Sequence, residues 1–203
     1  MKRVFWPAFN FPALPDKGAR MLADSPDPIR HGTMAYALKR IREDNIPGAM
    51  AEIGVYRGET SEYLHAFAPS TRLYLFDSFA GFENSDDDRF RDTSVNFVKQ
   101  RLGNLDNVEF RVGFFPDTAV GLENETFSFV SYDADKYDVA LSTLEFFYPR
   151  LSPGGYFFAH DFSSPESDFA VQRAVREFLS DKPELLIELP DLGGSALFRK
   201  LRA

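Results

Sequence analysis

A short apolar run followed by a glycine turn and a helix constrains this chain more than any other feature. Residues 49–55 read Ala-Met-Ala-Glu-Ile-Gly-Val, an apolar run interrupted only by Glu52 and closed by Gly54 and Gly58. Helical spacing then begins and continues over residues 59–67. A buried strand, a glycine turn and a helix form the opening unit of doubly wound α/β domains, in which ligands bind beyond the carboxyl ends of the strands.

The glycine turn differs from the fingerprint of dinucleotide-binding domains. It reads Gly-x-x-x-Gly, from Gly54 to Gly58, and it lacks the middle glycine that lets a pyrophosphate approach the backbone. The Glu52 carboxylate also faces the position that a phosphate would need. These residues favour a nucleotide with a cationic amino group and no phosphate, and S-adenosylmethionine (SAM) is the commonest of these. Close packing of the strand against its helix is the structural alternative for the two glycines.

Length and charge limit the classes of partner. With 203 residues we expect a single domain spanning residues 1–203. The net charge of −8 disfavours electrostatic binding to nucleic acid or to an anionic membrane. No apolar stretch approaches the roughly 18 residues of a membrane span, and we expect a cytoplasmic protein. A homo-oligomer is compatible with these features.

The chain contains no cysteine and three histidines. This composition excludes disulfides, thiolate nucleophiles and cysteine-based zinc sites. A bound metal would therefore depend mainly on carboxylate oxygens, which favours a hard cation such as Mg²⁺.

The first 30 residues carry five prolines and little periodicity. We expect them to form an extended arm or a lid, with a short helix around residues 18–23, and we place the core at residues 31–203. Apolar spacing then predicts helices at residues 30–45, 59–67, 93–102, 116–122, 139–148 and 169–179.

Seven apolar runs predict the strands, at residues 49–55, 72–77, 108–112, 127–133, 156–161, 185–189 and 195–201. Residues 151–155, Leu-Ser-Pro-Gly-Gly, are interpreted as a sharp turn before the fifth strand. The last two runs are joined without a helix, which predicts an antiparallel hairpin at one edge. We therefore predict a doubly wound, Rossmann-like α/β fold with a seven-stranded, mostly parallel sheet.

Acidic side chains gather at the predicted carboxyl ends of these strands. Asp77 lies 19 residues after Gly58, near the spacing at which an acid binds ribose hydroxyls. Asp133 and the pair His160-Asp161 follow neighbouring strands and should converge beside the nucleotide crevice. Oxygen ligands that converge in this way are a plausible Mg²⁺ site. The structural alternative is a set of helix N-caps, at which aspartate is favoured.

Several motifs occur in an order that resembles the macrocin O-methyltransferase family, over residues 30 to 180. They are Ala-Glu-Ile-Gly-Val-Tyr-Arg-Gly at 51–58, Leu-Phe-Asp-Ser-Phe-Ala-Gly-Phe at 75–82, Phe-Pro-Asp-Thr at 115–118, Asp-Ala-Asp-Lys-Tyr at 133–137, Tyr-Pro-Arg-Leu-Ser-Pro-Gly-Gly-Tyr at 148–156, His-Asp-Phe at 160–162 and Ala-Val-Gln-Arg-Ala-Val-Arg-Glu-Phe at 170–178. This family comprises class I SAM-dependent enzymes that act on sugar hydroxyls of natural products. The resemblance implies SAM as cofactor and a divalent metal, Mg²⁺ or Mn²⁺, near the transferred methyl group.

The resemblance also assigns candidate residues. It implies Asp133 and Asp161 as metal ligands and Asp135 as the general base. We add His160 as a third metal ligand or a second base, and Lys136 as a further candidate base. The predicted SAM contacts are Glu52, Gly54, Tyr56, Gly58, Ser61, Asp77, Ser78, Gly113 and Asp133.

The chain departs from the family at His160, where an Asp-Asp pair is typical. A neutral imidazole in place of a carboxylate removes a negative charge and a hard ligand, so we expect weaker Mg²⁺ binding and a shift toward softer divalent ions.

The activity that we expect is methyl transfer from SAM to a hydroxyl of a small molecule, a sugar or a natural-product glycoside. Two alternatives belong to other classes. One is a catalytically silent domain that binds SAM or a protein partner on the same fold. The other is an NAD(P)-dependent reductase, because Tyr132 and Lys136 spell the Tyr-x-x-x-Lys pair of short-chain dehydrogenases.

Overall fold

A single seven-stranded sheet organises the protein in the computed structural model, which describes residues 16–81 and 90–201. The strand order is β3-β2-β1-β4-β5-β7-β6, and β7 runs antiparallel to both of its neighbours while the other pairs are parallel. The strands are β1 (Ala49–Ile53), β2 (Leu73–Asp77), β3 (Val108–Val112), β4 (Phe127–Tyr132), β5 (Leu151–Ala159), β6 (Ile187–Glu188) and β7 (Ala196–Arg199). The predicted fold class is confirmed, including the antiparallel hairpin at one edge.

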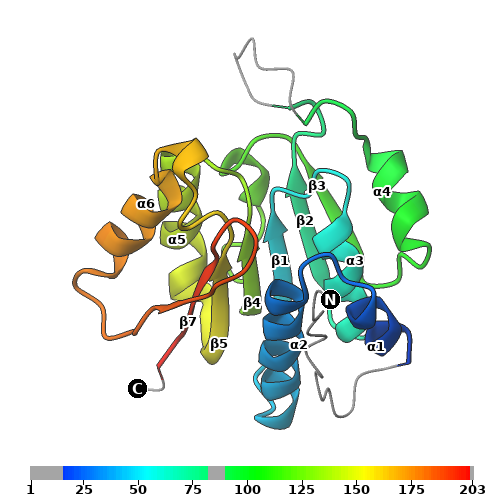
Figure 1. The fold of residues 1–203 in the computed structure, drawn as a ribbon, viewed down its shortest axis with the longest axis horizontal. Coiled ribbons are helices and arrows are strands. Elements are labelled where there is room, and N and C mark those ends of the chain that lie inside the picture. The colour runs from blue at the N-terminus through cyan, green and yellow to red at the C-terminus, as the bar shows by residue number, and fades with distance from the viewer. Residues whose placement is uncertain (1–15, 82–89, 202–203) are drawn as a thin grey trace, which may run out of the picture.

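Helices cover both faces of the sheet (Figure 1). Their bounds are α1 (Asp16–Ala23), α2 (Pro28–Glu43), α3 (Glu59–Phe67), α4 (Val95–Leu102), α5 (Tyr137–Arg150) and α6 (Ala170–Leu179), with short 3-10 turns at η1 (Asp117–Ala119) and η2 (Pro165–Ser167). The apolar sides of α1 to α4 pack on one face, and those of α5 and α6 pack on the other. In the described ranges, no helix combines the length and the apolar character that crossing a membrane requires.

The two central strands, β1 and β4, are buried at every residue. This is the pattern of parallel strands that are covered by helices on both faces, and it explains why they appear in the sequence as continuous apolar runs. Because β1, β4 and β5 are neighbours, the side chains that follow them meet at one edge of the sheet.

Two sequence expectations need correction. The interpretation of residues 151–155 as a sharp turn was wrong, because β5 begins at Leu151, directly after α5. The backbone of this segment is paired, since Gly154 donates to the Lys200 carbonyl and the Gly155 carbonyl accepts from Lys200. These pairings are tertiary, so the proline and glycines could not reveal them.

The N-terminal expectation is corrected in part. Residues 16–30 are largely helical: α1 confirms the expected short helix, and α2 begins at Pro28 instead of at residue 30. Asp27 caps α2 by accepting the Arg30 backbone N–H at 3.1 Å, with proline at the first helical position. Residues 1–15, on which the arm or lid hypothesis chiefly rests, lie outside the described residues.

Gly54 brings the turn after β1 against the end of β4. Its φ is +86°, and an added Cβ would lie well inside the 3.0 Å limit from the Asp133 carbonyl oxygen. The Asp133 backbone N–H in turn donates to the Ile53 carbonyl at 2.8 Å. Only glycine satisfies both the left-handed backbone and this close approach.

Gly54→Ala should therefore destabilise the fold. The loss should be far larger than for a glycine with a similar φ whose added Cβ would meet no other atom. Gly121 provides that control, since its φ is +89° and nothing lies within 4 Å of an added Cβ. We expect Gly121→Ala to cost about 1–2 kcal/mol and Gly54→Ala to cost more than about 4 kcal/mol, as measured by denaturant unfolding. Equal losses in the two variants would show that the close approach to Asp133 is unimportant.

Candidate active site

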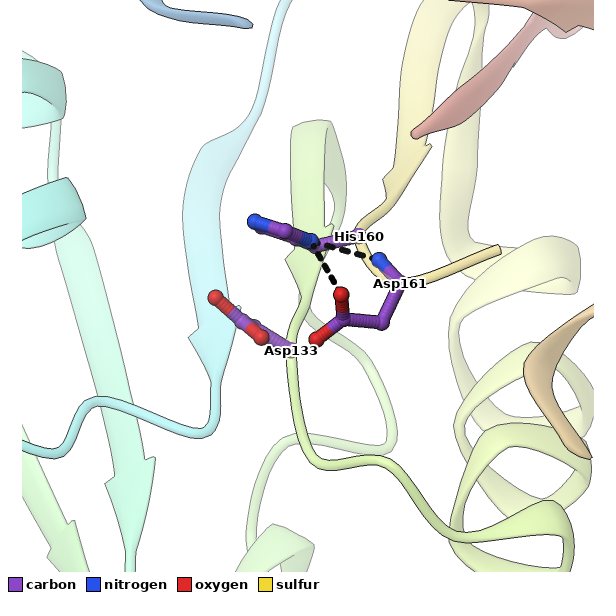
Figure 2. A group of neighbouring side chains, drawn as sticks. All are labelled: Asp133, His160 and Asp161. Carbon is purple, nitrogen blue, oxygen red and sulfur yellow. Dashed lines mark hydrogen bonds and ion pairs between the residues drawn. The ribbon is translucent and has the colours of Figure 1, made fainter. Parts of the chain in front are cut away.

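Three side chains form a compact cluster at the carboxyl ends of β4 and β5 (Figure 2). One ligand atom from each of Asp133, His160 and Asp161 lies within 4.8 Å of the others. Opposite ligands of an octahedral Mg²⁺ are about 4.2 Å apart, from bonds of about 2.1 Å. The donor set therefore fits a divalent cation after a small contraction, and the predicted convergence of these residues is found.

His160 and Asp161 interact through the Nδ1 atom of the imidazole. The imidazole Nδ1 lies 2.5 Å from the Asp161 backbone nitrogen and 3.2 Å from an oxygen of the Asp161 carboxylate. Burial lowers the pKa of His160, but the Asp161 and Asp133 carboxylates outweigh this effect and the net pKa is raised. The pKa of Asp161 is lowered in spite of its burial, because His160 stabilises the ionised form.

Asp135 lies next to this cluster, and its carboxyl group is partly protonated near neutral pH. Burial and the negative charges of Asp133 and Asp161 raise its pKa to about 7. Its φ of +59° is unusual for a residue with a side chain. A carboxyl group that is balanced between its two protonation states near pH 7 can accept a proton from a hydroxyl.

Arg30 occupies a position that sequence reasoning missed. Its guanidinium donates to Asp133 Oδ2 at 2.6 Å and to Thr60 Oγ1 at 3.0 Å. Recognising Asp27-Pro28 as a helix start would have placed Arg30 in the first turn of α2. Its pairing with a residue 103 positions away depends on tertiary structure.

Glu52 lies on β1 and is almost fully buried, with 1% of its surface exposed. Burial raises its pKa to about 8, and the hydrogen bond that Ser61 donates to Oε2 at 2.5 Å offsets part of this rise. In the cofactor-free protein Glu52 is therefore protonated at neutral pH. Ser61, a predicted SAM contact, is held by this bond at the base of α3.

Asp77 ends β2 and holds the glycine turn in place. Its Oδ2 accepts the backbone N–H groups of Val55 and Tyr56 at 2.7 and 2.8 Å, and its Oδ1 accepts that of Phe79 at 2.6 Å. Each carboxylate oxygen has two lone pairs, so Oδ1 keeps the capacity to accept a further hydrogen bond. The structure places Asp77 at the predicted position and adds a backbone-organising role.

The other predicted SAM contacts surround this turn, and each has a protein partner. The Tyr56 hydroxyl donates to Asp92 at 2.7 Å, and the Ser78 hydroxyl donates to the Gly81 carbonyl at 2.8 Å. The remaining two are glycines: the Gly113 N–H donates to the Asp77 carbonyl, and Gly58 caps α3 at a φ of +73°. Direct contact between SAM and any of these four residues stays a prediction.

The loop between β6 and β7 covers the acidic cluster. An added Cβ on Gly193 would come within 3.0 Å of both Asp161 and His160. Leu192, next to it, donates its backbone N–H to Asp27 Oδ2 at 3.0 Å, which ties the loop to the start of α2. Sequence reasoning interpreted the glycine pair 193–194 only as part of a hairpin turn.

A cleft of about 700 Å³ opens beside the cluster. Most of the residues that line it are polar or glycine: Asp135, Lys136, Tyr137, Asp161, Ser163, Ser164, Pro165, Glu166, Ser167, Asp168, Ala170, Gly193 and Gly194. Asp135 and Asp161 therefore face the cleft, whereas His160 is buried at 9% exposure and does not line it.

The geometry excludes the catalytic pair of a reductase. The Tyr132 side chain is fully buried, and its hydroxyl donates to the Lys136 carbonyl at 2.7 Å. The exposed Lys136 side chain therefore does not share a catalytic face with this tyrosine.

The sheet with its reversed β7 strand, and the acids at the ends of β1 and β2, define the class I methyltransferase fold. The O-methyltransferase NovP, a solved structure, has this fold, with a TM-score of 0.75 at 22% identity over 86% of this chain and 81% of its own. The family model Macrocin-O-methyltransferase (TylF) matches residues 27–185, and the chain belongs to this family. It is an O-methyltransferase that uses SAM as methyl donor.

Two relatives with named activities are similar at somewhat higher identity. Mycinamicin III 3''-O-methyltransferase of Micromonospora griseorubida is 29% identical over 174 residues, covering 73% of this chain and 67% of the relative. The 8-demethyl-8-(2,3-dimethoxy-alpha-L-rhamnosyl)-tetracenomycin-C 4'-O-methyltransferase of Streptomyces olivaceus is 26% identical over 188 residues, covering 76% and 71%.

The raised pKa of Glu52 predicts a pH-dependent loss of stability. The ordinary value is 4.5 and the folded value is about 8, so the folded state retains a proton that the unfolded state releases. This contribution is complete below pH 4.5 and is lost as the pH rises to about 8, by about 1 kcal/mol per pH unit.

Glu52→Gln should remove this slope, so its melting temperature should rise relative to wild type between pH 5 and pH 8. Thermal denaturation at constant ionic strength measures the difference, with Glu59→Gln on the surface of α3 as the control. Parallel pH curves for Glu52→Gln and wild type would contradict the buried, protonated state of Glu52.

Proposed function

We propose that this protein transfers the methyl group of SAM to a hydroxyl of a sugar or glycoside, with Asp135 as the base. The observation that carries the proposal is the polar cleft beside Asp135. Its lining of hydroxyl, carboxylate and backbone groups offers hydrogen-bond partners for a polyhydroxylated acceptor, and its single aromatic residue, Tyr137, offers little surface for stacking. The names of the two relatives, which act on sugar-bearing compounds, support the same substrate class.

We assign SAM binding to the turn after β1, which forms the cofactor side of the site. Glu52, buried on β1 beside Ser61, would pair with the amino group of SAM, which favours its ionised form. Asp77 would accept a ribose hydroxyl through Oδ1, the oxygen that makes a single backbone hydrogen bond. The absence of a side chain at Gly54 lets the Asp133 backbone pack directly against this turn.

The reaction is an in-line displacement. The acceptor oxygen attacks the methyl carbon while the carbon–sulfur bond breaks, and the bonding pair passes to sulfur to give S-adenosylhomocysteine. The hydroxyl proton passes to a carboxylate oxygen of Asp135. The protein contributes mainly by holding the acceptor in position and by accepting this proton.

Asp133, His160 and Asp161 would hold a divalent cation, since their donor atoms converge and two of the three are carboxylates. When bound, such a cation lowers the pKa of a coordinated hydroxyl. The imidazole in this set favours Mn²⁺ or Co²⁺ over Mg²⁺. His160 is a poorer candidate for the base than Asp135, because it is buried away from the cleft.

Asp135→Asn should lower methyl transfer by about 10²- to 10⁴-fold while SAM affinity stays within threefold of wild type. The assay follows labelled methyl from SAM into a panel of glycosides, with catechol as a non-sugar acceptor, and calorimetry measures SAM binding. Asp138→Asn, an exposed acid in the first turn of α5, is the control. Transfer to catechol alone, or full activity of Asp135→Asn, would contradict the proposal.

Asp77→Ala should weaken SAM binding at least tenfold, since a partner of a buried hydroxyl contributes about 1.5–3 kcal/mol. It should also lower the melting temperature, because three backbone N–H groups lose their acceptor. Asp92→Ala is the control, as Asp92 contacts the same turn through the Tyr56 hydroxyl and the Arg57 guanidinium. An unchanged SAM affinity in folded Asp77→Ala would refute the ribose assignment.

A further inference from the structure

The Arg30 side chain places a positive charge next to the acidic cluster of Asp133, His160 and Asp161. The Arg30 guanidinium lies 2.6 Å from Asp133 Oδ2, and the side chains of this pair are only 11% and 27% exposed. Asp133 is one of the three residues whose ligand atoms converge on the candidate metal position. A cation that binds there must therefore share or take over a carboxylate oxygen that Arg30 holds.

The placement of Arg30 favours this contact over a chance surface pairing. Arg30 lies in the first turn of α2, at the end of the helix where the dipole disfavours a cation. The Nη2 atom that contacts Asp133 also donates to Thr60 Oγ1, at the start of α3, which fixes the position of the guanidinium. Its Nε is buried and has no hydrogen-bond partner among the described residues, so Arg30 lies in a desolvated position with Asp133 as its charged partner.

The electrostatic balance supports the same conclusion. His160 stands where a carboxylate would add a negative charge, so Arg30 faces a cluster with two aspartate side chains. Charge interactions strengthen as water is excluded, and the partial burial of Asp133 and Arg30 limits screening.

We propose that Arg30 is a positioning residue that occupies the cation side of Asp133, so that a divalent ion binds only by displacing its guanidinium. The inference rests on the proposed function only in taking the cluster to be a metal site. Arg30 then controls the affinity for the metal, because its guanidinium lies where the ion would otherwise bind tightly.

The test measures Mn²⁺ affinity by electron paramagnetic resonance, in which the signal of the free ion disappears on binding. The full chain is titrated with S-adenosylhomocysteine present and with no acceptor. We expect Arg30→Gln to bind Mn²⁺ at least tenfold more tightly than wild type, because the competing charge is removed. Arg30→Lys keeps the charge and should stay within threefold of wild type.

Arg40→Gln is the matched control, since Arg40 lies on the same helix and pairs with Asp44 at the surface. It should leave the Mn²⁺ affinity unchanged. If Arg30→Gln does not fold, as judged by circular dichroism, Arg30→Met replaces it and should show the same tenfold gain.

Unchanged or weaker Mn²⁺ binding in the folded uncharged variant would overturn the proposal, as would Arg30→Lys that binds Mn²⁺ as tightly as Arg30→Gln. A tenfold loss of S-adenosylhomocysteine affinity in Arg30→Gln, without a gain in Mn²⁺ affinity, would make Arg30 a cofactor-binding residue instead. Because none of these measurements needs turnover, failure to methylate any acceptor would test the proposed function alone.

Discussion

The close approach between Gly54 and the Asp133 carbonyl is the constraint on which the site depends. It joins the turn after β1 to the end of β4, the neighbouring strands at which the two halves of the doubly wound sheet meet. A side chain at Gly54 would separate these strands at their carboxyl ends. The cofactor side, with Glu52, and the acceptor side, with Asp133 and Asp135, are adjacent because this contact is a backbone contact.

Charge is distributed unevenly across the two sides of that contact. Glu52 is buried in the core beside Ser61, and its pKa is raised to about 8, which suits a cofactor that brings its own amino group. The acidic cluster is instead compensated from within, by Arg30 on Asp133 and by His160 on Asp161. Asp135 lies beside this cluster, and its burial together with the negative charges of Asp133 and Asp161 raises its pKa to about 7. We infer that Glu52 is suited to bind a cation and Asp135 to accept a proton.

The acceptor side is built from parts of the fold that follow the common sheet. The segment after β5 and the loop before β7 line the cleft, and Asp27 ties that loop to the start of α2. Loops of this kind generally vary more between related proteins than the sheet does, and they commonly carry the binding residues. The two relatives are 29% and 26% identical to this chain over the aligned residues, and the name of the second includes a rhamnosyl group.

The places of the strands along the chain, the glycine turn after β1 and the acids at the strand ends could be predicted from the sequence alone. These follow from local periodicity and from the rule that parallel strands end at one edge, so Glu52, Asp77, Asp133 and the pair 160–161 could be named from their positions alone. Tertiary structure decided what each carboxylate contacts. The partners of Asp133 and Asp77 lie 103 and 22 positions away, and burial sets whether an acid is charged. Neither long-range pairing nor desolvation leaves a periodic trace in the sequence, which is why Arg30 and the Gly193 loop emerged only from the folded chain.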